Sequence, residues 1–366
     1  MNFDIDFRTK IVSGEDCVKK NASLISAKRA FIVTGKSGAK KSGALDDILA
    51  VLGENGAEYE IFDKIGENPL LSVCVEGGKR AAEFGADAVI GIGGGSALDA
   101  SKAVALYASC RLDDEKDLFD KAKCTGCLPI YAVPTTAGTG SEANPYAVMT
   151  LDGGRAKKSI GNPLCYPKVS FVDPKYTYSL SEYYTVSTAL DAFAHALESY
   201  LSPKSTVFSE SLALFAAKNI YSVLSENTET FDGGAREKLA YSSCAAGAAI
   251  SVTGTGFPHP LGYSITLLHG IPHGIACAVF DGDFIELNDK TDEGHKKLDK
   301  FFRFIGTDRK TLISLLTRLS ETGIKLSPDE IKEHVDLIKG AGNYVNSPYV
   351  LSDEEKYGLY KKHFAE

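Results

Sequence analysis

The sequence predicts an α/β first half and an all-helical second half. Up to about residue 174, short apolar runs alternate with stretches of helical periodicity, and beyond it only helical periodicity continues. Such alternation is typical of a parallel sheet with crossover helices. The length of 366 residues suits two domains. We therefore expect an α/β domain over residues 1–178 and an all-α domain over residues 179–366.

The composition indicates a globular protein that binds neither nucleic acid nor membrane. Hydrophobic residues make up 44% of the chain and charged residues 24%, with a net charge of -8. This negative charge disfavours nucleic acid and anionic lipid as partners. No segment is long and apolar enough to span a bilayer, and the first residues lack the pattern of a signal peptide. The eight cysteines follow no disulfide pattern, so we expect a cytoplasmic protein.

In the first half, each predicted strand is a short apolar run, and each predicted helix has apolar residues three or four positions apart. The strands are expected at residues 30–34, 58–62, 88–92 and 129–133, and the helices at residues 42–53, 73–84 and 97–108. In the second half the same periodicity predicts seven helices. These are expected at residues 181–201, 206–224, 236–250, 296–304, 309–321, 329–338 and 353–364.

Two polar loops follow predicted strands and suit a dinucleotide. In Gly93-Gly-Gly-Ser96, bare backbone lets a phosphate approach, and the next helix directs its N-terminus at the negative charge. One turn later, Asp99 is expected to hold a ribose hydroxyl or a loop amide. The segment Pro134-Thr-Thr-Ala-Gly-Thr-Gly-Ser-Glu142 offers hydroxyls for a pyrophosphate or a nicotinamide amide. Because the carboxyl ends of parallel strands share one edge of the sheet, the loops should converge. The candidate contacts are Gly93, Gly94, Gly95, Ser96, Asp99, Thr135, Thr136, Thr139 and Ser141.

The end of the first predicted strand bears on the choice of cofactor. An acidic residue at this position commonly binds the ribose 2′-hydroxyl of NAD. This chain has Gly35, Lys36 and Ser37 there, followed by Lys40 and Lys41. The lysines could also belong to a solvated helix start. The missing carboxylate and the nearby cations favour a 2′-phosphate, so we expect NADP(H) to be preferred over NAD(H).

The predicted helix at residues 181–201 carries Asp191 and His195 one turn apart on the same face. Such a pair alone often shares only a hydrogen bond on a helix surface. Downstream, His259 and His273 would complete a set of one carboxylate and three imidazoles, which suits a divalent metal. These residues lie in the helical domain and the nucleotide loops in the α/β domain. The cleft between the domains is therefore the expected active site.

Together these segments resemble the iron-containing (group III) alcohol dehydrogenase family. The resemblance rests on Gly93 to Lys102, Pro134 to Glu142, Asp191-x-x-x-His195 and the segment from His259 to Gly274, and it covers nearly the whole chain. It implies a Rossmann-like dinucleotide-binding domain and an all-helical metal-binding domain, which together form a dehydroquinate synthase-like fold. It also implies that Asp191, His195, His259 and His273 are metal ligands and that Lys158 reaches the nicotinamide ribose.

One position departs from the family pattern. Many members carry a further histidine four residues after the third ligand, where this chain has Tyr263. A competing alignment places His259 at that later histidine and Thr255 at the third ligand, and it requires an insertion. The ungapped alignment keeps all four ligands and is preferred, which makes Tyr263 or His269 the candidate for proton transfer. The other histidines lie among charged residues and are expected to face solvent: His295, His334 and His363.

The activity implied by the resemblance is hydride transfer between a nicotinamide and a metal-bound alkoxide. The substrate would be a small alcohol or aldehyde and the ion Fe²⁺, with Zn²⁺ or Ni²⁺ permitted. We also expect a homodimer. Three alternatives stay open: a glycerol- or polyol-dehydrogenase type using Zn²⁺, a lyase of the dehydroquinate-synthase type, and a non-catalytic nucleotide-binding regulator. The apolar and aromatic residues around His259 disfavour the lyase, which needs a basic pocket.

Overall fold

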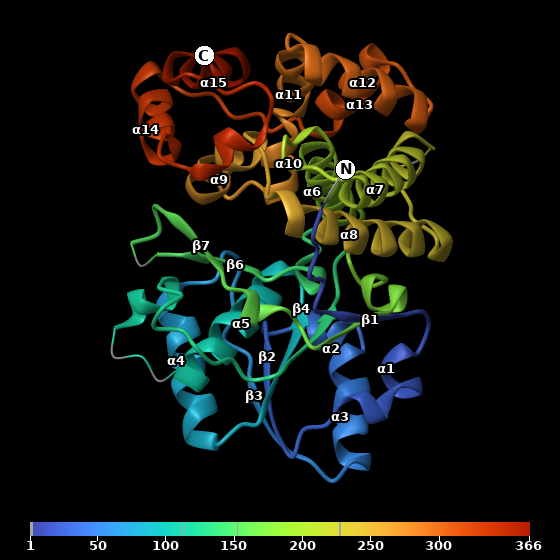
Figure 1. Cartoon of the computed structure of the whole chain (residues 1–366), viewed down its shortest axis with the longest axis vertical. Helices are drawn as coiled ribbons and strands as arrows, with labels where there is room; N and C mark the ends of the chain where they lie inside the picture. The colour runs from blue at the N-terminus through green and yellow to red at the C-terminus, as the bar shows by residue number, and fades with distance from the viewer. Residues whose placement is uncertain (1–2, 111, 113, 152, 227) are drawn as a thin grey trace. The chain divides into compact units, whose positions relative to one another are not determined.

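The computed structural model describes residues 3–110, 112, 114–151, 153–226 and 228–366, which divide into two units (Figure 1). One unit, here called the sheet unit, comprises Asp6–Leu180 and Asp232–Cys244. The other, the helical unit, comprises Ser181–Phe231 and Ala245–Glu366 together with residues 3–5. The predicted fold class, a parallel sheet with crossover helices followed by a helical half, is confirmed.

The sheet unit is built on a parallel six-stranded sheet in the order β1-β8-β5-β4-β2-β3. Its strands are β1 Lys10–Ser13, β2 Arg29–Thr34, β3 Glu58–Phe62, β4 Ala88–Gly93, β5 Ile130–Pro134 and β8 Val169–Val172. In the register between β4 and β5, Gly93 is paired with Pro134. The segment Gly93–Ser96, here called the Gly-rich loop, and the segment Pro134–Glu142, here called the Thr-rich loop, therefore leave the sheet side by side.

The inner strands β2, β4, β5 and β8 are mostly apolar because both faces of the sheet are covered, whereas the edge strands β1 and β3 carry charged residues. Successive side chains of a strand point to opposite faces. In β2, Phe31 and Val33 belong to one hydrophobic core, and Ala30 and Ile32 belong to the other. The crossover helices are α1 Cys17–Lys20, α2 Gly38–Lys41, α3 Ala44–Glu54, α4 Leu71–Phe84 and α5 Gly95–Cys110.

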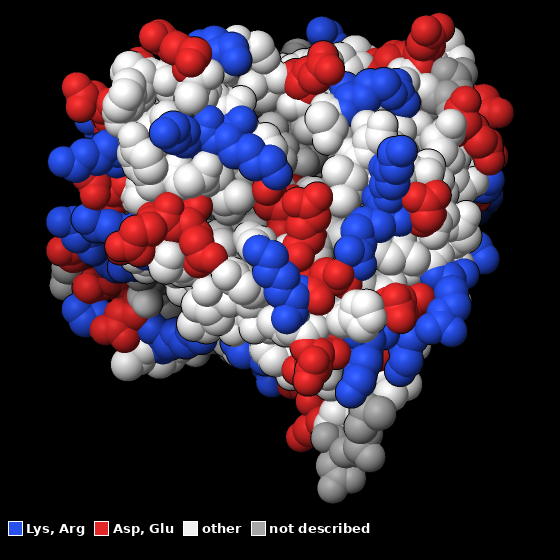
Figure 2. Space-filling model, turned by 90° about the horizontal axis from the view of Figure 1, so that it is seen from above, with Lys and Arg blue, Asp and Glu red and all other residues white. Residues whose placement is uncertain are grey.

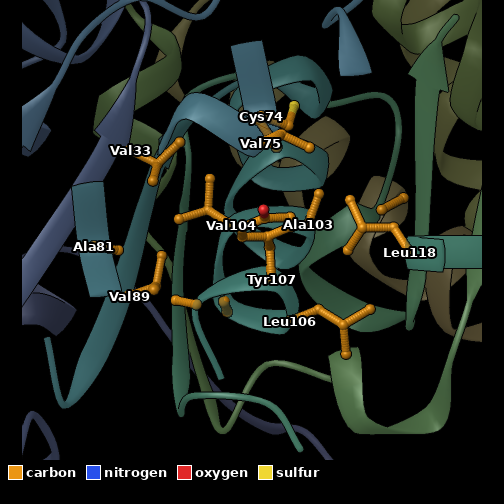
Figure 3. Packing of buried hydrophobic residues seen from close by; sticks show 14 of the residues in the cluster. Val33, Cys74, Val75, Ala81, Val89, Ala103, Val104, Leu106, Tyr107 and Leu118 are labelled. Atoms are coloured by element: carbon orange, nitrogen blue, oxygen red, sulfur yellow. The ribbon is translucent and has the colours of Figure 1, made fainter. Parts of the chain in front are cut away.

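Figure 3 shows the core on the α4–α5 side of the sheet. Val33 and Val89 from the strands lie near Val104 of α5, and all three side chains are buried. Burial of one such side chain contributes roughly 1.5–3 kcal/mol. At Gly78 of α4 an added Cβ would lie 2.7 Å from the Tyr107 ring, so the Tyr107 side chain of α5 packs directly against the backbone of α4. This packing fixes α5, whose first turn belongs to the predicted phosphate loop.

Helix α5 begins at Gly95, two residues earlier than predicted, so Gly95 and Ser96 lie in its first turn. Further elements of this unit lie outside the predicted ranges: strands β1 and β8, the short helices α1 and α2, and an antiparallel hairpin of β6 Tyr146–Thr150 and β7 Lys157–Gly161. Strand β7 is mostly polar and lacks the apolar run that indicated other strands, whereas β6 is apolar and was not predicted.

The second half contains all seven predicted helices, with ends shifted by a few residues. The helices are α6 Glu182–Leu201, α7 Val207–Glu226, α8 Gly233–Thr253, α9 Pro258–His269, α10 His273–Ala278, α11 Asp281–Asn288, α12 Asp292–Ile305, α13 Arg309–Leu319, α14 Pro328–Ile338 and α15 Asp353–Phe364. Helices α9, α10 and α11 were not predicted; α9 contains Pro258 and Pro260, and Pro272 directly precedes α10. Proline is tolerated in the first turn of a helix, where its missing N–H is not needed.

None of the helices in the described ranges combines the length and apolarity needed to cross a bilayer. Figure 2 shows one face of the molecule, on which acidic and basic side chains are intermingled.

Candidate metal centre and nucleotide-binding loops

Three helices of the helical unit carry the four predicted metal ligands. Helix α6, which is buried along most of its length, places Asp191 and His195 in the interior. His259 is the second residue of α9, directly after Pro258, and His273 is the first residue of α10. The structure therefore holds all four side chains on the rigid starts or middles of helices.

The four side chains meet around one carboxylate oxygen. Asp191 Oδ1 lies 3.6 Å from Nε2 of His259 and 3.9 Å from Nε2 of His273. It lies 4.0 Å from Nε2 of His195. Two oxygen or nitrogen ligands of one ion, each about 2.0–2.2 Å from it, lie at most about 4.4 Å apart. All three separations therefore suit donors that share one divalent cation.

Two atoms at this centre are buried without a hydrogen-bond partner among the described residues: Asp191 Oδ1 and His259 Nε2. A buried polar atom without a partner is costly, and native proteins rarely keep one without a reason. A cation between the two atoms removes this cost. Burial alone would raise the pKa of Asp191, but His195, His259 and His273 hold that pKa below its usual value. The residues present therefore fit a divalent metal ion.

Glu198, which was not predicted as a site residue, fixes the orientation of His259. Its Oε1 lies 2.7 Å from His259 Nδ1, and its Oε2 accepts a hydrogen bond from the backbone N–H of Gly256. With Nδ1 occupied, His259 presents Nε2 to Asp191. Burial would lower the pKa of His259, but Glu198 and Asp191 raise it to about 10. The sequence contained one signal, because Glu198 is three residues after His195 on the same helix.

The backbone of α10 touches α6 beside Asp191. A Cβ added at Gly274 would lie 1.8 Å from the carbonyl oxygen of Ser187, so only glycine permits this approach. The close contact brings His273 to Asp191. One turn along α10, Cys277 also faces the site: one donor atom each from Asp191, His259, His273 and Cys277 lie within 4.8 Å of one another.

The two candidates for proton transfer lie in different surroundings. The ring of Tyr263 stacks on His273, with centroids 5.5 Å apart and an interplanar angle of 26°. His269 Nε2 lies 3.0 Å from His334 Nε2. In the competing alignment Thr255 would be a ligand, but its hydroxyl accepts a hydrogen bond from Asn343 at 2.6 Å. The structure thus places Tyr263, and neither His269 nor Thr255, against a predicted ligand.

The expectation that three other histidines face solvent is wrong for His334. This side chain is buried, its Nδ1 lies 2.8 Å from Ser264 Oγ, and burial lowers its pKa to about 4. His363 is partly buried and pairs with Asp283. His295 is exposed, as expected. Side chains of two other helices, Ser264 and His269 of α9 and Tyr360 of α15, contact His334, which its charged sequence neighbours did not indicate.

In the sheet unit the two predicted loops converge. The backbone N–H of Thr135 donates to the carbonyl oxygen of Gly93 at 2.9 Å. A Cβ at Gly94 would lie 3.1 Å from Thr136, and one at Gly95 would lie 2.4 Å from Thr139. Gly93 itself has φ +150°, which favours glycine. The first amides of α5, those of Gly95 and Ser96, have no acceptor within their own helix and can bind a phosphate.

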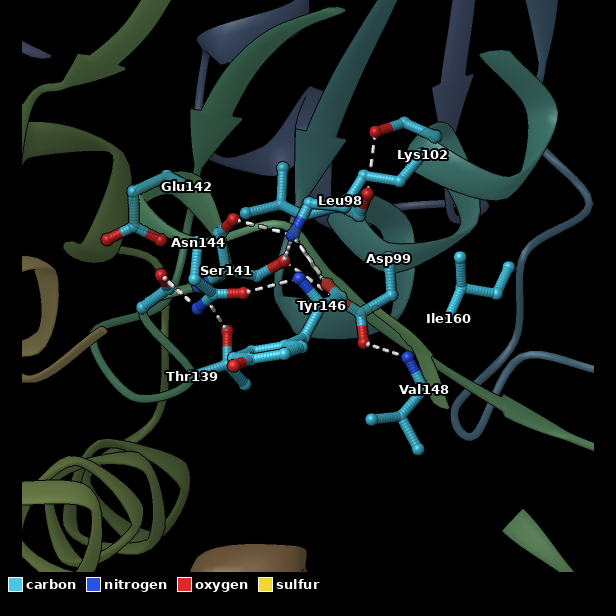
Figure 4. A network of polar contacts seen from close by, with 12 residues as sticks. Leu98, Asp99, Lys102, Thr139, Ser141, Glu142, Asn144, Tyr146, Val148 and Ile160 are labelled. Carbon is cyan, nitrogen blue, oxygen red and sulfur yellow. Dashed lines mark hydrogen bonds and ion pairs between the residues drawn. The ribbon is translucent and has the colours of Figure 1, made fainter. Parts of the chain in front are cut away.

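Two of the predicted cofactor contacts, Asp99 and Ser141, make hydrogen bonds within the protein (Figure 4). Asp99 accepts hydrogen bonds from the Ser141 hydroxyl at 2.6 Å and from the Val148 amide at 2.8 Å. Asp99 therefore binds the hydroxyl of Ser141 and an amide of strand β6. Lys102, which was not predicted, is buried and donates to the carbonyl oxygens of Ser141 and Tyr146, each at 2.7 Å. This network anchors the Thr-rich loop to α5.

The remaining predicted contacts lie at the sheet edge and on the hairpin. Lys36 and Ser37 follow β2 and have exposed side chains, and no carboxylate ends that strand. Lys158, expected at the nicotinamide ribose, is exposed on β7, and its Nζ lies 4.4 Å from the centroid of the Phe119 ring.

Comparison with known proteins identifies the family of the chain. Residues 8–174 match the family model described as iron-containing alcohol dehydrogenase, and residues 185–338 match the model of that family's C-terminal part. The chain belongs to the iron-containing alcohol dehydrogenase family. The resemblance predicted from the sequence is thereby confirmed.

Individual members of the family align over most of the chain. The NADPH-dependent butanol dehydrogenase of Clostridium saccharobutylicum is 29% identical over 85% of this chain and 81% of its own. The NAD-dependent methanol dehydrogenase of Bacillus methanolicus is 31% identical over 73% of this chain and 71% of its own. The crystal structure of an iron-containing alcohol dehydrogenase from Thermotoga maritima is 35% identical, covers 99% of both chains and has a TM-score of 0.92.

The raised pKa of His259 predicts pH-dependent metal binding in this family member. Below a pKa of about 10 the imidazole keeps the proton that an ion at Nε2 must displace. Rising pH therefore weakens the competition, and the association constant for Zn²⁺ should rise about tenfold per pH unit from about pH 7 to 8, with about one proton released. Calorimetry in buffers of different ionisation enthalpy measures both. Glu198→Gln should reduce the slope, and a pH-independent constant would contradict the assignment of His259.

The buried ammonium of Lys102 predicts a large loss of stability on its removal. Lys102→Met leaves the carbonyl oxygens of Ser141 and Tyr146 and the carboxylate of Asp99 without their cation, so the free energy of unfolding should fall by about 3–5 kcal/mol. Lys64→Met is the control, because Lys64 is half exposed in its pair with Glu76 and should cost less than about 1 kcal/mol. Urea unfolding of both variants tests this. Equal losses would show that burial of Lys102 has no special role.

Proposed function

We propose that this chain is a metal-dependent, NAD(P)-linked alcohol dehydrogenase that also reduces aldehydes or ketones. The observation that supports this most directly is the buried Asp191 Oδ1, which faces three imidazoles and has no hydrogen-bond partner among the described residues. In the proposal Asp191, His195, His259 and His273 hold the ion. A divalent ion supplies Lewis acidity, which lowers the pKa of an alcohol hydroxyl and polarises a carbonyl.

The chain's own residues have two further roles in the proposal. Glu198 keeps His259 in the tautomer whose Nε2 is available to the ion. Tyr263, stacked on His273, is proposed to pass the hydroxyl proton of the substrate toward solvent. His269 remains a second candidate, but its Nε2 is taken up by His334. The four ligands leave room for substrate at an ion that accepts five or six donors, as Fe²⁺ does and Zn²⁺ can.

For the cofactor we propose NADP(H) in preference to NAD(H). The amides of Gly95 and Ser96 and the hydroxyls of Thr135, Thr136 and Thr139 are the groups proposed to bind it. At the end of β2 the exposed Lys36 and Ser37 could contact a 2′-phosphate, which a carboxylate at Gly35 would repel. The butanol dehydrogenase relative uses NADPH and the methanol dehydrogenase relative NAD, so the family includes both. Lys158 is proposed to reach the nicotinamide ribose.

We also propose that the protein is a cytoplasmic homodimer that acts on small alcohols or aldehydes. None of its eight cysteines forms a disulfide, as suits a reducing compartment. The sedimentation coefficient of the purified chain tests the dimer.

Removal of a proposed ligand should abolish metal binding and activity and leave cofactor binding intact. Asp191→Ala and His273→Ala are expected to lose the ion, because either change removes a donor from the shared centre, whereas the nucleotide loops belong to the other unit. Metal content by mass spectrometry, turnover of a panel of alcohols and aldehydes, and NADPH fluorescence measure the three properties. His295→Ala, at an exposed histidine, is the control. Asp191→Ala with full metal content would show that the ligand assignment is wrong.

Replacement of Gly35 tests the cofactor preference. Gly35→Asp should move the ratio of kcat/KM from NADPH toward NADH by about 10- to 100-fold, which is about 1.4–2.8 kcal/mol. A Cβ at Gly35 lies 3.0 Å from the carbonyl oxygen of Ile65, so the substitution also crowds the backbone. Gly35→Ala introduces the same crowding without charge and should affect both cofactors alike. An unchanged ratio in Gly35→Asp would exclude Gly35 from cofactor selection.

A further inference from the structure

We propose that Cys277 is a ligand of the ion held by the helical unit and that its thiolate makes the site select Zn²⁺ over Fe²⁺. This inference deepens the proposed function and rests on its central point, that an ion binds at Asp191. Cysteine was not among the ligands expected from the sequence. The tertiary structure brings its sulfur to the centre formed by Asp191, His259 and His273.

The sulfur lies beside the other donors. Sγ of Cys277 lies 3.6 Å from Nδ1 and 3.6 Å from Nε2 of His273, so it contacts the ring midway between the two nitrogens. A sulfur and a nitrogen on one zinc ion are separated by about 3.6 Å as well, and a rotation of the Cys277 or His273 side chain would direct both at the ion. The compact group of four donors comprises Asp191, His259, His273 and Cys277. His195 lies one turn along α6 from Asp191 and remains within reach as a fifth donor.

The fold makes room for the sulfur at this place. Cys277 follows His273 by four residues, so both lie on one face of α10. On the facing helix α9, a Cβ at Gly262 would lie 2.9 Å from Cys277 Sγ. Glycine at position 262 therefore lets the thiol sit between α9 and α10. Cys277 is fully buried, which keeps the sulfur away from water and directed at the site.

A thiolate changes what the site binds. When Cys277 coordinates the ion, its thiol proton passes to solvent and one metal–sulfur bond forms. The carboxylate of Asp191 and the thiolate of Cys277 together carry two negative charges, which balance a divalent cation in a buried place. Thiolate is a soft donor that favours Zn²⁺, whereas a set of only carboxylate and imidazole suits Fe²⁺ as well.

Cobalt spectroscopy of the full-length protein tests the inference without measuring activity. The metal-free protein is titrated with Co²⁺ alone under reducing conditions. Visible d–d bands report that the ion is bound, and an intense near-ultraviolet charge-transfer band reports a cobalt–sulfur bond. We expect both in the wild type. Cys277→Ser and Cys277→Ala should lose the near-ultraviolet band and keep the visible bands. Cys244→Ser, at a buried cysteine of the sheet unit, should keep both.

The outcomes separate this inference from the function on which it rests. Visible bands without a near-ultraviolet band in the wild type would overturn ligation by Cys277 and leave the metal site standing. A near-ultraviolet band that persists in Cys277→Ser would likewise overturn ligation by Cys277 and leave the metal site standing. Absence of both bands in the wild type would overturn the metal site itself. With Zn²⁺ and Fe²⁺ offered together without oxygen, Cys277→Ser should retain a lower ratio of Zn²⁺ to Fe²⁺ than the wild type, and an unchanged ratio would overturn the selectivity.

Discussion

The helical unit depends on a single electrostatic arrangement, a buried carboxylate that faces imidazoles instead of hydrogen-bond donors. Asp191 stays ionised in the interior because His195, His259 and His273 surround it. Such a charge is costly to bury, and a cation among its neighbours offsets the cost. Helix α6 can therefore be buried along most of its length only because the helices packed on it bring compensating groups.

The elements around Asp191 are shaped to maintain this arrangement. Glu198 holds one nitrogen of His259, and the backbone contact at Gly274 sets the distance of His273. Glu198 and Gly274 thus position the proposed ligands His259 and His273 and are not themselves proposed ligands. Such supporting groups set the orientation and basicity of the ligands, so they tune a metal site as much as the ligands do. In this protein they come from two helices, α6 and α10, which are separated by tens of residues in the chain.

The sheet unit uses a buried cation for a comparable purpose. Lys102 and Asp99 of α5 together hold Ser141, Tyr146 and Val148, so the Thr-rich loop is fixed to the helix that follows the Gly-rich loop. The two loops are thus one rigid body, as a site for a diphosphate requires. The hydroxyl of Ser141 was predicted to contact a cofactor. Ser141 instead connects the Thr-rich loop to α5 through its hydrogen bonds with Asp99 and Lys102.

The sequence by itself determined the parallel sheet, seven helices of the second half and the two polar loops, and it predicted that one aspartate and three histidines form a metal site. Apolar runs and helical periodicity are local properties, and the residue types of the proposed ligands suit a divalent metal. Only the tertiary structure decided the parts that depend on distant neighbours. Glu198 meets His259 across 61 residues, Cys277 faces Asp191 from another helix, and His334 is buried despite its charged surroundings in the sequence. Burial and hydrogen-bond partners arise from packing between elements, which local periodicity does not encode.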